Sequence, residues 1–193
     1  MEGIFAVITG IGLSAACGFR VFVPLLALSL ASRYGYLHLA PGFDWIGGSY
    51  AAMAFASATL LEIIAYYIPW LDNAMDAIAS PVSVIAGTIA AASVITDLPP
   101  SVRWIFALIA GGGIAGILQG TTTALRAKSS LITGGTGNPF FSTAELAGSV
   151  VIAVLAIVVP IVSLVLVASL VVFALFKAGR SLSTKRKGGS YGL

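Results

Sequence analysis

Residues 150–176 read VVIAVLAIVVPIVSLVLVASLVVFALF, a run in which every side chain is uncharged and most are large and apolar. About 20 apolar residues in a helix are enough to cross the ~30 Å hydrocarbon core of a bilayer. Strands of a membrane β-barrel would alternate apolar with polar residues, and this run does not. The run therefore predicts membrane-spanning helices.

The rest of the chain has the same character. Hydrophobic residues make up 59% of the 193 residues and charged residues only 9%, whereas soluble domains average about 25% charged residues. This composition leaves too little polar surface for a water-soluble globule, so we expect a lipid bilayer as the partner of the surface and no nucleic-acid partner. The single cysteine, Cys17, excludes an internal disulfide and a cysteine zinc site. We interpret the amino-terminal segment as a retained span and not as a cleaved leader.

We predict an all-α, polytopic transmembrane bundle of about six spans over residues 1–177, followed by a basic tail at residues 178–193. Arg20 and Pro24 indicate a broken first span, and Pro81 indicates a kink in the third. The expected spans are residues 3–31, 49–68, 74–95, 102–118, 142–160 and 160–177.

The last apolar segment and the loop at residues 32–48 bear on where the spans end. Residues 142–176 would form a helix of ~50 Å, too long for one perpendicular span, so we divide them near Pro160. A single tilted and kinked helix is the alternative. The aromatic residues of the loop at 32–48, among them Tyr34, Tyr36 and Trp45, suit the membrane interface.

The basic residues are distributed unequally between the two sides of a six-span bundle. The side that holds both termini would carry Arg126, Lys128, Lys177, Arg180, Lys185, Arg186 and Lys187, and the other side only Arg33 and Arg103. The positive-inside rule then predicts that both termini are cytoplasmic. The tail serves as an orientation signal, or it also contacts anionic lipid headgroups.

Small residues recur with a spacing of four in two segments, at Gly10, Ser14 and Gly18 and again at Gly112, Gly116 and Gly120. The segments that follow, residues 19–24 and 121–128, both look irregular. A hydroxyl-x-x-Glu motif also occurs twice, ending at Glu62 and at Glu145. These pairs predict an inverted three-plus-three repeat with copies at residues 3–97 and 102–177, a plan found in transporters. Small-residue faces also serve contacts between chains, so a homo-oligomer stays open.

Two acids are candidates for a central site. Glu62 lies in the apolar run 51–68, where an ionised carboxylate costs at least ~2.5 kcal/mol, so it should be protonated, paired or exposed to water. We interpret it as a proton- or cation-binding carboxylate, or else as an interfacial or packing residue paired with Arg20. Glu145 completes the pattern Ser142-x-x-Glu145, a capping box, and its alternative role is to meet Glu62 near the midplane.

Arg20 needs an acceptor inside the membrane. A salt bridge to Glu62, Asp72 or Glu145 is the first expectation, and an anionic ligand is the second. Asp72 and Asp76 share one helix face near a helix start, where they either cap the helix or form a cation site with Glu62. No histidine cluster accompanies them, which argues against a transition-metal enzyme site, although the sequence leaves a metal site undecided. We expect no cofactor.

The polar stretch at residues 119–139 is expected as a loop. Asn138 turns inward in this prediction and lines a cavity with Gln119 and the threonines at 121–123. The glycines at 134–137 either form an anion nest with Arg126 and Lys128 or simply connect two helices. The spacing is not that of a P-loop.

Three segments resemble the DUF4126 family of bacterial membrane proteins. They read ACGFRVFVPLL at residues 16–26, LEIIAYYIPWLDN at residues 61–73 and TGNP at residues 136–139. The resemblance covers almost the whole chain except the basic tail. It implies a multi-pass protein of the bacterial cytoplasmic membrane and draws attention to Glu62, Asp72, Asp76, Asn138 and Glu145, but it supplies no substrate or reaction.

Three functions remain open at this stage. The first is a small transporter or channel-like protein for a small solute or ion. In this hypothesis Glu62 and Glu145 bind the ion or proton, and Arg20 balances charge or contacts an anionic solute. The second is a membrane enzyme acting on a lipid or isoprenoid phosphate, although no dense acidic motif beyond Asp72 and Asp76 favours catalysis. The third is a structural or assembly protein whose polar residues all pair internally.

Overall fold

The computed structural model describes residues 2–134 and 136–188, without the side chains of residues 2, 69, 70, 73 and 177–188. Over this described part the chain is helical and contains no strand, so the predicted all-α class is correct. The elements in order are α1 (Glu2–Cys17), α2 (Phe22–Arg33), the 3₁₀ turn η1 (Asp44–Gly47), α3 (Ser49–Tyr66), α4 (Pro69–Val94), α5 (Pro100–Phe106), the π-helical segment η2 (Ala107–Gly112), α6 (Gly113–Thr133), α7 (Asn138–Val158) and α8 (Pro160–Gly188).

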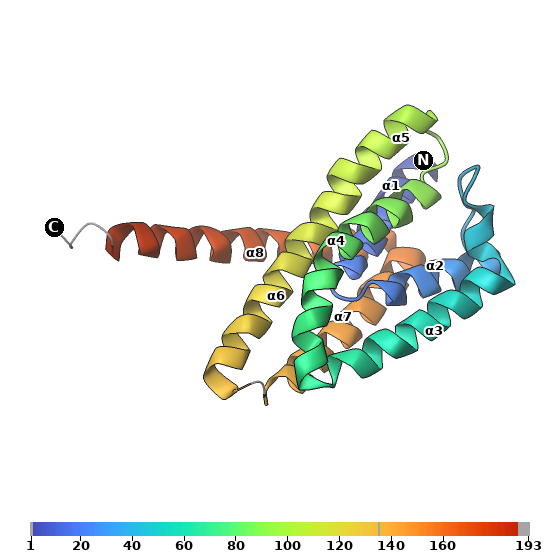
Figure 1. Cartoon of the computed structure of the whole chain (residues 1–193). Helices are drawn as coiled ribbons and strands as arrows, with labels where there is room; N and C mark the ends of the chain where they lie inside the picture. Colours follow the sequence, from blue (N-terminus) through green and yellow to red (C-terminus); the bar gives the residue numbers. More distant parts are fainter. Residues whose placement is uncertain (1, 135, 189–193) are drawn as a thin grey trace.

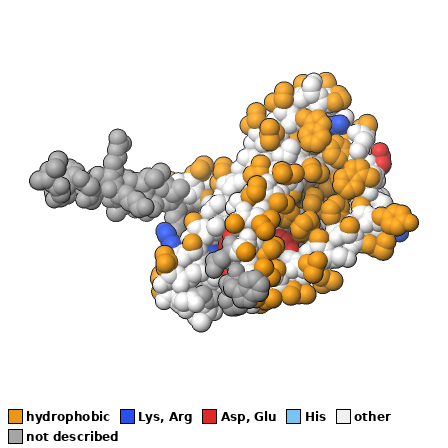
Figure 2. Space-filling view, in the orientation of Figure 1, with side chains coloured by type: hydrophobic (Ala, Val, Ile, Leu, Met, Phe, Trp, Pro, Cys, Tyr) orange, Lys and Arg blue, Asp and Glu red, His pale blue; other side chains and the backbone are white. Residues whose placement is uncertain are grey.

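Four helical segments are long and apolar enough to cross a membrane, as judged from the described residues: Ser49–Tyr66, Ala74–Val94, Pro100–Thr133 and Asn138–Val158. The other apolar helices, Gly3–Cys17, Phe22–Arg33 and Pro160–Phe176, are shorter. Large apolar side chains cover the visible outer surface (Figure 2), and Tyr50 and Leu131 are each 87% exposed. Exposing such a surface to water would be unfavourable. The apolar helices therefore indicate a membrane protein. The count of six spans stays a prediction.

The break predicted within residues 3–31 is present, but the chain then returns towards the start of α1, since Tyr36 and His38, after α2, line one cavity with Phe5. α1 ends at Cys17, and Arg20 lies in the short non-helical connection before α2 begins at Phe22. Pro24 does not cause the break, because it lies in the first turn of α2, where a backbone N–H would have no helical partner. Cys17 is fully buried, as expected for a small residue retained in a packed helix.

The predicted loop at 119–139 is largely wrong. α5, η2 and α6 form one continuous helical segment up to Thr133, and Gly134 ends it with a left-handed φ of 62°. The hydroxyl groups that made this stretch look like a loop bond to their own helix: Thr121 donates to the Ile117 carbonyl at 2.7 Å and Thr133 to the Ser129 carbonyl at 2.8 Å. Hydroxyl side chains that bond within a helix remain compatible with a membrane span.

Helix starts also differ from those expected. The turn predicted at residues 70–73 lies inside α4, which begins at Pro69 and continues through Pro81. α7 begins at Asn138, with Pro139 in its first turn, rather than at Ser142. The division near Pro160 is correct: α7 ends at Val158, and α8 starts at Pro160. The first part of α8 packs against the bundle, where Ser163 and Val167 are buried, and its later part extends beyond it (Figure 1). The basic side chains predicted to contact headgroups, at residues 177–187, lie outside the described side chains.

The first set of small residues, at Gly10, Ser14 and Gly18, packs α1 against α4 and α6. Ser14 donates a hydrogen bond of 2.6 Å to the Gly87 carbonyl. A Cβ atom added at Gly18 would lie 2.6 Å from the Ala115 carbonyl oxygen, which explains why the smallest residue occupies this position. The second set packs against α4 at two of its three positions: a Cβ at Gly112 would lie 2.6 Å from Thr88 Oγ1 and one at Gly116 3.1 Å from Val84, whereas one at Gly120 would meet no described atom of another element within 4 Å.

The predicted irregular segment at residues 121–128 is a regular part of α6, and this expectation is wrong. The repeat itself, with copies at residues 3–97 and 102–177, stays a prediction.

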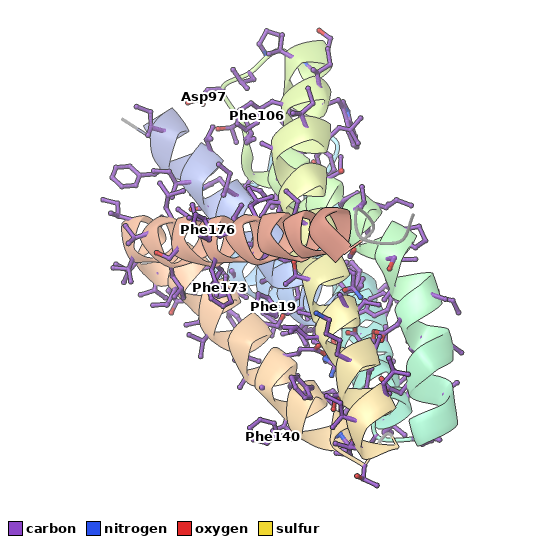
Figure 3. All side chains as sticks on the ribbon, turned by 90° about the vertical axis from the view of Figure 1, so that its left-hand side faces the viewer. Phe19, Asp97, Phe106, Phe140, Phe173 and Phe176 are labelled. Atoms are coloured by element: carbon purple, nitrogen blue, oxygen red, sulfur yellow. The ribbon has the colours of Figure 1, made fainter. Side chains whose placement is uncertain are left out.

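The bundle has two ends, which we name by the elements that lie there. In Figure 3, Asp97 marks the end where α1 starts, and Phe140 marks the opposite end, near the start of α7. The α3–α4 and α6–α7 turns lie at the Phe140 end (Figure 1). We call these the α1 end and the turn end of the bundle.

Candidate functional site

Six buried charged residues gather towards the turn end of the bundle. They come from the α1–α2 break and from α3, α4, α6 and α7, and each is less than 8% exposed. We call this set the charged cluster, and its members are Arg20, Glu62, Asp72, Asp76, Arg126 and Glu145.

Arg126 is the centre of the charged cluster. One of its terminal nitrogens contacts the Asp72 carboxylate and lies 3.2 Å from Asp76 Oδ1, and the other contacts the Glu145 carboxylate. Arg126 therefore joins α6 to α4 and α7. The prediction that Asp72 and Asp76 share one face is confirmed, because one guanidinium pairs with both.

This role of Arg126 was not predicted, because residues 119–139 were expected to form a loop. The available signal was the spacing of Gln119, Thr122, Arg126 and Ser129, which is that of one helix face. All four residues are buried. A polar face turned inward is the expected pattern for a helix whose other faces contact lipid.

Arg20 reaches from the α1–α2 break to α7. Its Nη2 donates to the Ser142 carbonyl at 2.9 Å and to Ser142 Oγ at 2.5 Å, and it lies 3.5 Å from Glu145 Oε2. The expected salt bridge of Arg20 is thus present, with Glu145 as its partner. Arg20 Nε and Nη1 are buried and have no hydrogen-bond partner among the described residues.

Tyr66, at the end of α3, contacts both arginines. The guanidinium carbon of Arg20 lies 3.7 Å from the centre of its ring, and that of Arg126 lies 4.4 Å from it. The electron-rich face of a tyrosine attracts a cation by up to about 2 kcal/mol when water is excluded. Tyr66 therefore stabilises two neighbouring positive charges that would otherwise repel each other.

Glu62 is not an isolated carboxylate. Its Oε1 accepts a hydrogen bond of 2.8 Å from the Val21 amide and its Oε2 one of 3.1 Å from the Phe22 amide. These amides are free donors at the start of α2, so Glu62 caps this helix from a neighbouring one. Glu145, in contrast, does not cap a helix. The predicted capping box is wrong, because Glu145 lies two turns inside α7 and pairs with the two arginines.

Asn138 turns inward, as predicted. Its amide nitrogen donates to Asp72 Oδ2 at 2.6 Å and to Ser130 Oγ at 2.9 Å. Asp72 lies in the first turn of α4, but no side-chain hydrogen bond caps this helix within the described residues. Asp72 thus lies where the helix dipole favours an acid, as expected, while its described side-chain hydrogen bonds go to Arg126 and Asn138.

Two other predicted features, Gln119 and the glycine-rich residues 134–137, do not belong to the charged cluster. Gln119 is buried, and its amide nitrogen bonds to Thr123 Oγ1 at 3.2 Å on its own helix. Thr136 and Gly137 donate their backbone N–H groups to Thr133, and Lys128 is exposed. These donors are directed towards the end of α6, which favours a connecting segment over an anion nest at residues 134–139.

The acids of the charged cluster outnumber its guanidiniums by two. Burying an unpaired carboxylate in an apolar bundle is costly, and such groups commonly bind a proton instead. In the described part of the chain no group of three or more histidine, cysteine or acidic residues is arranged to hold a metal ion. The surplus of buried acids is chemically able to bind protons, and these acids lie on α3, α4 and α7.

A comparison with protein-family models finds one match, a family described as a domain of unknown function (DUF4126), over residues 7–180. No curated protein and no solved structure matches the chain significantly.

Proposed function

The chain belongs to the DUF4126 family, and we propose that it is an integral membrane transporter or channel-like protein in which the charged cluster binds protons. The observation that carries the proposal is the excess of buried acids over guanidiniums in an apolar bundle. A transported solute would be coupled to the protons that this cluster gains and loses.

Asp76 and Glu145 are the acids that we assign to proton exchange. Asp76 Oδ1 accepts no hydrogen bond from the described residues, although it lies 3.2 Å from Arg126. Glu145 uses the same oxygen, Oε2, for both arginines. Glu62 is less suited to exchange, because each of its oxygens already accepts a backbone amide and these bonds favour a fixed, ionised carboxylate. Glu62 therefore acts as a positioning residue for the α1–α2 break.

Proton binding at these positions would change contacts between helices. Neutralising Glu145 weakens its attraction to Arg20 and to Arg126. The contacts of α7 with the α1–α2 break and with α6 would therefore become weaker. Neutralising Asp76 weakens the contact between α4 and α6. A short non-helical break between helices is a common place for transporters to rearrange, and Arg20 lies in this one.

The orientation belongs to this proposal. We place the turn end, which carries Lys128, on the cytoplasmic side, following the positive-inside rule. The predicted common side for both termini does not fit this placement, because α1 starts at the opposite end of the bundle (Figure 3). The protons of the cluster would then exchange more readily with the cytoplasm than with the other side. Labelling of single cysteines introduced at Leu131 and at Tyr36, which are 87% and 76% exposed, would report the two sides separately.

The test is proton flux in proteoliposomes that contain a pH-sensitive dye. After an imposed pH step, vesicles with the protein should equilibrate faster than empty vesicles, and Asp76→Asn or Glu145→Gln should slow this flux about tenfold or more. Asp97→Asn is the matched control, because Asp97 is exposed at the α1 end, where it accepts a hydrogen bond from its neighbour Thr96, and lies outside the charged cluster. Equal flux in empty vesicles, or in all three variants and the wild type, would overturn the proposal.

A structural role is the second candidate, and a specific observation favours it. Glu62 caps α2 and Arg20 bonds to Ser142, so both residues hold helices together whether or not anything is transported. A protein with only this role would lose stability in Glu62→Gln but show no proton flux in the wild type. An enzyme acting on a lipid phosphate is less well supported, because carboxylates already occupy the arginines that would bind the phosphate.

A further inference from the structure

Two adjoining cavities lie at the α1 end, far from the charged cluster. The first has a volume of about 570 Å³ and the second about 430 Å³. Leu37 and His38 line both cavities, so the two cavities are neighbours that share a wall in the loop between α2 and α3. His38 is the only histidine of the chain, and the proposed proton site does not use it.

The walls of these cavities are fixed by hydrogen bonds between elements. The Ala40 amide donates to the Ser93 carbonyl at 2.7 Å, which ties the loop to the end of α4. Arg33 Nη1 donates to Ser49 Oγ at 2.6 Å, and Ser29 Oγ donates to the Ile46 carbonyl at 2.6 Å. The cavities are therefore largely preformed, as small-molecule sites usually are.

The two cavities differ in chemistry. Arg33, His38 and Asp44 line the first, which thus offers a guanidinium, an imidazole and a carboxylate. Among the described residues no arginine, lysine or acidic residue lines the second, and Phe5, Val94 and Ile157 from three helices contribute apolar side chains to it. A cavity with charged side chains beside one without them matches an amphiphile with a charged head and a hydrocarbon tail.

The aromatic residues around this loop place the cavities at a membrane interface. Tyr34, Tyr36 and Trp45 are 71%, 76% and 56% exposed, and Tyr50 is 87% exposed. Tyrosine and tryptophan gather at the level of lipid headgroups, where one end of the side chain is apolar and the other is hydrated. The polar cavity would thus lie among headgroups and the apolar one would extend towards the acyl chains.

We propose that the paired cavities bind one phospholipid whose headgroup carries both a phosphate and an amine. Arg33 and His38 donate hydrogen bonds to the phosphate, Asp44 accepts the ammonium group, and an acyl chain enters the second cavity. A headgroup with only a negative charge would face Asp44, and one with only a positive charge would face Arg33. The opposite charges of Arg33 and Asp44 therefore select a zwitterion.

The first test uses native mass spectrometry of the delipidated full-length protein in detergent. It is titrated with phosphatidylethanolamine and with phosphatidylglycerol that carry identical acyl chains. The wild type should bind phosphatidylethanolamine more tightly, and Asp44→Asn should remove this preference. Arg33→Gln should weaken binding of both lipids about tenfold, because it removes a charged donor to the phosphate they share. Equal affinity of the wild type for the two lipids, or a preference that survives in Asp44→Asn, would overturn the proposal.

The second test fills the apolar cavity. Ala6→Trp places a large ring in this space, because Ala6 lines it, and should lower phosphatidylethanolamine binding about tenfold or more. Ala54→Trp is the matched control, since Ala54 is exposed on α3 and outside both cavities. Circular dichroism verifies that each variant is folded. Equal binding by the two folded tryptophan variants would count against the acyl-chain site.

This inference is independent of proton transport. None of the substituted residues belongs to the charged cluster, so loss of lipid selectivity would leave the flux experiments unaffected. Conversely, the lipid preference should persist in Asp76→Asn, even where proton flux is lost.

Discussion

The two ends of the bundle handle charge in opposite ways. At the turn end, Arg126 is 2% exposed and pairs with three carboxylates from two helices. At the α1 end, Arg33 is exposed and donates to one serine hydroxyl, and the buried Arg103 reaches only the Pro41 carbonyl, at 3.4 Å, and the Phe43 ring among its described contacts. The comparison teaches that several charges buried together form a network that several helices must satisfy together, whereas a single charge can be satisfied locally. Substitutions at the two ends should therefore differ greatly in their effect on the free energy of unfolding.

The largest effect is expected at Arg126. Arg126→Met keeps a long side chain but leaves Asp72, Asp76 and Glu145 buried without their shared cation. Removing one partner of a buried ion pair costs about 3–5 kcal/mol, so the free energy of unfolding should fall by about this amount. Unfolding in mild detergent with increasing sodium dodecyl sulfate, followed by circular dichroism, measures the change.

Arg126→Lys provides the control for this substitution. It retains the charge but loses the planar group whose two nitrogens reach carboxylates on different helices. We expect a smaller loss of stability than in Arg126→Met. If the methionine variant were as stable as the wild type, the acids would already be neutral, and the ionic account of the charged cluster would be wrong.

An intermediate effect is expected at Glu62, which links the cluster to the backbone. Glu62→Gln keeps one carbonyl oxygen for the amide of Val21 or Phe22 but loses the charge and the second acceptor. Loss of a helix-capping acceptor costs about 1–2 kcal/mol. Hydrogen exchange at Val21 and Phe22 should become faster, while exchange in the middle of α7 should change little. Unchanged exchange at both amides would contradict the assignment of Glu62 as the cap of α2.

Some of this network could be predicted from the sequence, because an intramembrane charge has to find a partner. Arg20 was therefore expected beside a carboxylate, and it lies beside Glu145. The same reasoning did not identify Arg126, because glycine, serine and threonine suggested a loop around it. Composition was a poor guide here, since these hydroxyl groups bond to their own helix.

The expected capping role of Glu145 failed for a related reason. Both Asn138-Pro139 and Ser142 are plausible helix starts, since proline is favoured in the first turn and Ser142-x-x-Glu145 is a capping pattern. The helix takes the earlier start, and Ser142 and Glu145 then lie inside it, facing Arg20. Local patterns do not decide between such starts, because the choice depends on partners that lie far away in the sequence.

The smallest effect is expected at the α1 end, where Arg33→Gln should lower the free energy of unfolding by less than about 0.5 kcal/mol. Glutamine can still donate to Ser49, and exposed charges contribute little because water and salt screen them. The same detergent titration that is used for Arg126→Met measures it, and raising the salt concentration should leave the difference between variant and wild type nearly unchanged. A loss comparable to that of Arg126→Met would mean that Arg33 belongs to a buried network as well, and the contrast between the two ends of the bundle would disappear.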